Sequence, residues 1–139
     1  MKNLLPVLFS AVIILTLCIS GCTKDSLIVQ SNSTQNTTAI ANKPNSFSFA
    51  VDASLYYYSE THQLQINADT MNVAITISGH STGTGSVVIK DSTDKIIYQK
   101  DLGSNAVSAD IIKISDIPKI LDITLSNYTG KIALAVTGN

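Results

Sequence analysis

The side chains that could act as acids, bases or nucleophiles are few and scattered along this sequence. His62 and His80 are the only histidines. The pattern predicts His62 at the start of a strand and His80 in a loop from Gly79 to Gly83. Nucleophilic catalysis needs a nucleophile, a base and an orienting group held together, and none of the many serines lies in a nucleophile elbow. The sequence therefore predicts no catalytic residue, no enzyme and no cofactor.

Metal ligands are equally sparse. There is no pair of spaced Cys or His motifs of the kind that binds zinc. Asp91, Asp94 and Asp101 flank one predicted hairpin, and their carboxylates could supply hard oxygen ligands for calcium. The favoured interpretation is structural, because Asp91 and Asp94 are good turn residues and Asp101 ends a predicted strand. No metal site is predicted.

Tyr56-Tyr57-Tyr58 is the most unusual run in the chain. On a strand, Tyr56 and Tyr58 share one face while Tyr57 points to the other. Amphipathic rings suit a surface that stacks on sugars or contacts a protein, so Tyr56 and Tyr58 are candidate binding residues. The alternative is that both rings cover the edge of the core and pack across strands.

The N-terminus has the three-part layout of a secretory signal. Met1 to Asn3 is a short positive start, Leu4 to Ile19 is almost wholly apolar, and Ser20 and Gly21 are small. As a helix the apolar run would span about 24 Å, which is short of the roughly 30 Å hydrocarbon core of a bilayer. We expect residues 1–21 to be removed as a signal peptide.

The run Ile19-Ser20-Gly21-Cys22 resembles the lipobox of bacterial lipoproteins. The resemblance implies cleavage before Cys22 and attachment of a diacylglyceryl group to its thiol, with a further fatty acyl chain such as palmitate on the new amino group. Cys18 fits the lipobox pattern poorly, because the bulky Leu17 precedes it instead of a small residue. Diacylglycerol supplies the two chains that stable anchoring requires, and the mature chain would hold no second cysteine for a disulfide.

The resemblance also implies a cellular location for the protein. It would be lipid-anchored on the extracytoplasmic side of a membrane in the cell envelope. An Asp directly after the lipidated cysteine would resemble the inner-membrane retention signal of Gram-negative lipoproteins, and this chain has Thr23 at that position. In a Gram-negative host the outer membrane is therefore expected. Cys22 to Asp25 partly resembles a surface-export signal, and an ordinary polar tether is the alternative.

Residues 22–45 are predicted to be a flexible tether, since a Ser/Thr/Asn/Gln-rich stretch there buries too little to order itself. From residue 46 to 139 the apolar period is two, as in strands with one face on a core. The clearest runs are Met71 to Ile77, Leu121 to Leu125 and Ile132 to Val136. Turns are predicted at Ser59 to Thr61, Asp91 to Asp94 and Asn127 to Gly130.

This pattern predicts an all-β, antiparallel β-sandwich of eight or nine short strands. It resembles immunoglobulin-like and jelly-roll modules at the level of fold, which implies no function. Acids and lysines nearly balance and arginine is absent, which disfavours nucleic acid as a partner. The leading hypothesis is a non-enzymatic binding module for an envelope protein or glycan. The alternatives are an accessory subunit of an envelope complex and, less favoured, an enzyme with an unrecognised site.

Overall fold

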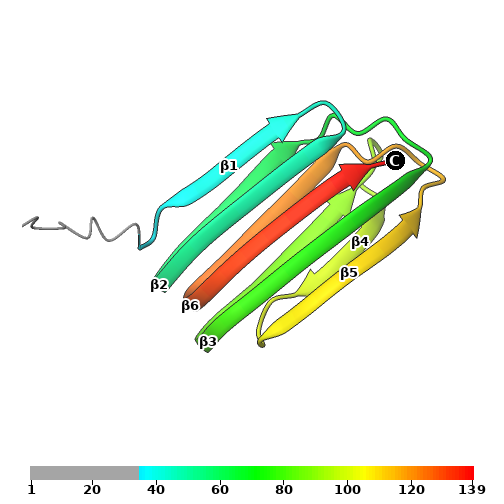
Figure 1. The fold of residues 1–139 in the computed structure, drawn as a ribbon. Helices are drawn as coiled ribbons and strands as arrows, with labels where there is room; N and C mark the ends of the chain where they lie inside the picture. Colours follow the sequence, from blue (N-terminus) through cyan, green and yellow to red (C-terminus); the bar gives the residue numbers. More distant parts are fainter. Residues whose placement is uncertain (1–34) are drawn as a thin grey trace, which may run out of the picture. The chain divides into compact units, whose positions relative to one another are not determined.

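The computed structural model describes residues 35–139, which fold into six antiparallel β-strands (Figure 1). The predicted signal peptide, Cys22 and most of the predicted tether lie outside the described residues. The described part has no helix long and apolar enough to cross a membrane. The strands are β1 (Thr38–Lys43), β2 (Ser46–Gln63), β3 (Thr70–Lys90), β4 (Ile96–Asp101), β5 (Ala106–Lys113) and β6 (Ile120–Gly138).

The strands β2, β3 and β6 are long, with 18, 21 and 19 residues, and each bends once near its middle. The pairing register shifts at each bend, between Ala53 and Tyr56 in β2 and between Ser78 and Thr84 in β3. Residues with positive φ mark the bends. Among them are Gly83 at 86° and Asn127 at 51°, residue types that tolerate this backbone region.

Bending divides one continuous hydrogen-bonded ladder into two layers. The first layer has the order β1, the first half of β2, the second half of β6, the first half of β3, and β5 (Figure 1). The second layer has the order second half of β2, first half of β6, second half of β3, and β4. Counted by layer there are nine strand segments, in a sandwich of five over four.

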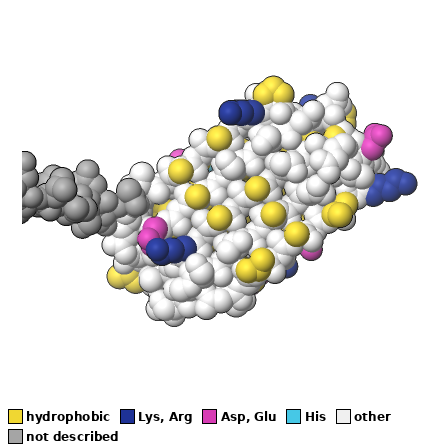
Figure 2. Space-filling view, viewed as in Figure 1, with side chains coloured by type: hydrophobic (Ala, Val, Ile, Leu, Met, Phe, Trp, Pro, Cys, Tyr) yellow, Lys and Arg dark blue, Asp and Glu magenta, His cyan; other side chains and the backbone are white. Residues whose placement is uncertain are grey.

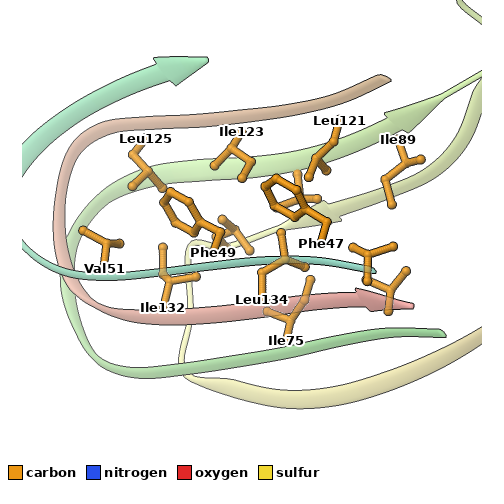
Figure 3. Packing of buried hydrophobic residues seen from close by; sticks show 14 of the residues in the cluster. Phe47, Phe49, Val51, Ile75, Ile89, Leu121, Ile123, Leu125, Ile132 and Leu134 are labelled. Atoms are coloured by element: carbon orange, nitrogen blue, oxygen red, sulfur yellow. The ribbon is translucent and has the colours of Figure 1, made fainter. Parts of the chain in front are cut away.

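The core lies between the layers, because alternate apolar side chains of both halves point inward. Phe47 and Phe49 of the first layer meet Leu121, Ile123 and Leu125 of the second (Figure 3). Each of these five side chains is at most 2% exposed. Ile132 and Leu134, from the second half of β6, belong to the same buried cluster. Both halves of β6 therefore contribute to one core, which makes the bend of that strand essential to the fold.

A buried tyrosine secures the chain where it crosses between layers. After β4 ends in the four-stranded layer, Leu102 leads the chain over to β5 in the other layer. The hydroxyl of Tyr128 donates a hydrogen bond of 2.9 Å to the carbonyl of Leu102, and both side chains are fully buried. Burial, with a smaller contribution from Asp101, raises the pKa of Tyr128 to about 12, so this hydroxyl stays a donor.

The predicted all-β antiparallel sandwich is confirmed, and so is the turn at Asp91 to Asp94 between β3 and β4. Two predicted turns are wrong. Ser59 to Thr61 lies inside β2, where all three of these polar side chains are exposed. Asn127 to Gly130 is not a hairpin turn but the bend of β6. The bend of β6 and a two-residue hairpin turn both favour Asn and Gly, which accept positive φ, so the sequence signal at Asn127 to Gly130 is the same.

The predicted tether extends too far. Residues 38–43 form β1, which pairs along its whole length with β2 at the edge of the five-stranded layer. All of its side chains are exposed or half-buried. An edge strand that buries so little has no apolar alternation, which is why its sequence looks like linker.

Candidate binding faces

The outer surface of the four-stranded layer, here called the polar face, presents hydroxyl, amide and charged side chains. The register aligns Thr61, Asp122, Val88 and Gln99 in one row across the four segments. A neighbouring row aligns Ser59, Thr124, Ser86 and Asp101. Apart from Val88, both rows consist of side chains that exchange hydrogen bonds with a polar ligand.

Asp122 is a hydrogen-bonded, ion-paired charge on the polar face. Its carboxylate accepts hydrogen bonds of 2.6 Å from the ammonium of Lys90 and 2.6 Å from the hydroxyl of Thr61. The bond from Lys90, and then that from Thr61, lowers the pKa of Asp122. The three side chains come from three neighbouring strand segments and form a fixed constellation at neutral pH.

Tyr57 is the exposed aromatic ring beside these rows, with 67% of its surface accessible. Its neighbours in the tyrosine run are placed differently. Tyr58 is 8% exposed, and Tyr56 is half-buried with its ring centroid 6.1 Å from that of Tyr58. Tyr56 and Tyr58 do share a face, as predicted, but it is the inner one. The two rings cover the edge of the core, and the sequence did not single out Tyr57 as the ring open to a ligand.

The nearest approach to a catalytic grouping is the cluster of Tyr58, Glu60 and His62 at this edge. The hydroxyl of Tyr58 lies 3.0 Å from the carboxylate of Glu60 and 3.1 Å from Nε2 of His62. Burial, and then the hydrogen bond to Glu60, raises the pKa of Tyr58. A tyrosine that acts as a base or nucleophile needs the opposite shift. The imidazole of His62 packs 5.1 Å from the ring of Phe47, so the cluster caps the core.

His80 lies at the bend of β3. Its backbone N–H donates to the side-chain oxygen of Asn105 at 2.8 Å, and its ring packs 5.0 Å from that of Tyr128. The ring nitrogen Nε2 lies 3.3 Å from the carbonyl of Gly83. These contacts hold the bend in place. The structure does not bring His80 and His62 together.

The aspartates considered as calcium ligands act in turns. Asp91 is 5% exposed and accepts hydrogen bonds from Thr93 N, Thr93 Oγ1 and Lys95 N at 2.7, 2.8 and 3.0 Å. The hydroxyl of Thr93 contributes most to the lowered pKa of Asp91. Asp101 lies at the far end of β4 and accepts from Gly103 N at 2.6 Å. Among residues 35–139 no group of three His, Cys, Asp or Glu side chains is placed to hold a metal ion.

The outer surface of the five-stranded layer, here called the alanine face, has a different chemistry. Two neighbouring rows run across all five strands, and all ten of their side chains are exposed. None is charged or aromatic, and charged side chains appear only toward the margins of this face (Figure 2). The rows are Ala41, Ser48, Ala135, Ala74 and Ala109, and then Ala39, Ala50, Ala133, Thr76 and Val107.

One end of the sandwich carries an open polar hollow of about 450 Å³. It lies between the chain segments around Asn67 and Ser115, and Asp69 and Asp116 bring carboxylates to it. The carboxylate of Asp116 is already paired with Lys95 at 2.8 Å, and this pairing lowers its pKa. The carboxylate of Asp116 is therefore engaged in an ion pair, as that of Asp122 is on the polar face.

The constellation on the polar face predicts an acid-dependent loss of stability. The pKa of Asp122 is lower in the folded chain than the value of about 4 for an unfolded chain. Its stabilisation is therefore complete above that value and is lost as the pH falls through the lowered pKa. Urea unfolding from about pH 6 to 2.5 should show the loss, and Asp122→Asn should show a shallower decline. An equal decline of the unfolding free energy with falling pH in the two proteins would contradict this role of Asp122.

No family model and no curated protein matches the sequence. A subunit of Bacillus endospore appendages, described as disulfide-linked pili, is similar with 11% identity and a TM-score of 0.42, over 73% of this chain and 91% of its own. A family 29 carbohydrate-binding module is similar with 10% identity and a TM-score of 0.39, over 72% of each chain. Likenesses this weak define no family for the chain.

Proposed function

We propose that this chain is a lipid-anchored protein of the bacterial cell envelope whose β-sandwich is a non-enzymatic binding module. The polar face is its ligand surface, and a glycan is the ligand that this surface suits best. The observation that carries the proposal is the hydrogen-bonded constellation of Lys90, Asp122 and Thr61, together with the exposed ring of Tyr57 four residues before Thr61 on β2.

Glycans are recognised by hydrogen bonds to their hydroxyls and by stacking of an aromatic ring on the sugar face. A carboxylate and an ammonium held in place provide both acceptors and donors without the entropic cost of ordering them on binding. The neighbouring row of Ser59, Thr124 and Ser86 extends this array on one side. Tyr57 supplies a large apolar ring, with a polar tip, on the same surface.

The anchor is proposed from the sequence around Cys22, since a diacylated cysteine would hold the domain at a membrane. The outer membrane of a Gram-negative host is the expected place. The domain would face away from the cytoplasm, where envelope glycans and proteins are available to it.

A glycan array probed with the detergent-solubilised full-length protein tests the binding proposal. We expect saturable binding to one glycan class, and Tyr57→Ser should weaken it roughly tenfold, an upper-range effect for one aromatic contact. Val107→Ser removes an apolar side chain that is even more exposed, 84% against 67% for Tyr57, from the alanine face and should leave binding unchanged. An array without signal, or equal loss in both variants, would refute the polar face as a glycan site.

The second candidate is an accessory subunit of an envelope complex, and the alanine face favours it. A large, uncharged surface of small side chains suits contact with protein rather than with a hydrated sugar. Pull-down from solubilised membranes distinguishes the candidates. A single stoichiometric partner whose capture survives Tyr57→Ser would support the accessory subunit.

A further inference from the structure

The composition of the alanine face is unusual for a strand surface in water. Seven of the ten side chains in its two central rows are alanine, and the others are Ser48, Thr76 and Val107. Alanine is depleted in strands because it packs poorly against cross-strand neighbours. The inward positions of the same strands are large, for example Phe49 and Leu134. The two central rows therefore present small side chains on the outer surface, where they let another surface approach closely.

From this surface we infer that two copies of the chain associate face to face through their alanine faces. Five strands at a spacing of about 4.8 Å, each about eight residues long at about 3.4 Å per residue, give a face of about 650 Å². Two such faces would bury roughly 1,300 Å², which lies within the range of stable protein–protein interfaces. The face needs no other element to reach that size.

The charges at its margins select one arrangement. Lys131 and Asp52 form an ion pair of 3.1 Å in the row at one end, and Lys43 lies in the row at the other end. If the twofold axis ran along the strands, Lys131 of the central strand β6 would meet its own copy. If it runs across the strands, the row of Asp52 meets the row of Lys43. Lys131 then lies over the uncharged Thr137 of the other copy, and Asp52 lies one strand away from the other copy's Lys43, at both ends of the face.

The same arrangement accommodates the side chain that protrudes most. Val107 of β5 is 84% exposed and lies one row away from Ala109 on the same strand. With the axis across the strands, β5 of one copy lies over β5 of the other. Each Val107 then lies over Ala109 of its partner, where a small side chain leaves room. An isologous interface needs this self-complementarity, because each contact occurs twice.

Sedimentation equilibrium of the full-length protein in detergent, at protein concentrations up to about 1 mM, tests the inference. We expect a reversible dimer, and Ala133→Lys should shift the association at least tenfold toward monomer because it buries two unpaired charges. Thr124→Lys on the polar face is the matched control and should not change it. Thermal melting of both variants shows that they are folded.

Three outcomes would overturn the inference: a monomer at every concentration, a dimer that Ala133→Lys leaves intact, or a dimer that Thr124→Lys disrupts. Binding of a foreign protein or a polysaccharide to the alanine face of a strictly monomeric chain would also overturn it. The glycan test at Tyr57 uses the opposite face, so failure of either proposal leaves the other standing.

Discussion

Gly83→Ala is expected to destabilise the domain by about 3 kcal/mol or more, a large fraction of the stability of a small domain. Gly83 has a φ of 86° at the bend of β3. A Cβ there would collide with the carbonyl of Asn127 and would lie 2.6 Å from the carbonyl oxygen of Ser126. Both obstacles are backbone of the neighbouring bend in β6, so neither can rotate away. Positive φ costs about 1–2 kcal/mol and overpacking a further 1–3 kcal/mol.

Gly79→Ala is the matched control. Gly79 has a φ of 63° in the same bend, but a Cβ there would meet nothing within 4 Å. The free energy of unfolding should therefore fall only by the cost of positive φ for a residue with a Cβ, about 1–2 kcal/mol. Urea unfolding of both variants measures the difference. Equal destabilisation would mean that the bends of β3 and β6 are not packed as the structure has them.

The experiment concerns the fold as a whole, because the bends are linked. The hydroxyl of Thr129 in β6 accepts a hydrogen bond of 3.0 Å from the backbone N–H of Leu55 in β2. The hydroxyl of Thr82 in β3 lies 3.3 Å from that of Thr129. The three long strands therefore turn from one layer to the other together.

Alternation of apolar residues was enough to predict the sandwich, because each half-strand buries one face. The runs from Met71 to Ile77 and from Ile132 to Val136 are buried at every second residue. Continuity of the long strands could not be predicted. The residues at the bends, such as Asn127 and Gly130, are those that also form hairpin turns.

The tyrosine run shows that alternation predicts which side chains share a face but not which face is buried. It predicted that Tyr56 and Tyr58 share a face, and their rings lie 6.1 Å apart. It could not identify the core side, because Leu55 and Tyr57 are also apolar. The bulge in β2 decides the outcome and buries Tyr58.

The two outer faces depend on register, which a single sequence does not contain. Lys90, Thr61 and Asp122 are far apart in the chain, and only pairing through β6 brings them together. In the same way, Ala74 and Ala135 each fill a small position between large ones. Their pairing in one row emerges only when β3 and β6 are aligned.

The proposal that depends least on the folded domain is the anchor, and it has the largest expected effect. Cys22→Ser removes the only thiol that the lipobox resemblance assigns to lipid attachment. Without diacylglycerol the signal peptide should stay uncleaved. Cys18→Ser is the matched control, since Cys18 lies within the predicted signal peptide and follows Leu17.

Metabolic labelling with a fatty-acid probe tests the central claim of an exported, lipid-anchored sandwich most directly. We predict strong labelling and a processed chain for the parent protein and for Cys18→Ser. Cys22→Ser should show no labelling and should accumulate as the precursor. Labelling and processing of Cys22→Ser at the parent level would contradict the account, since the domain would then reach its place without this anchor.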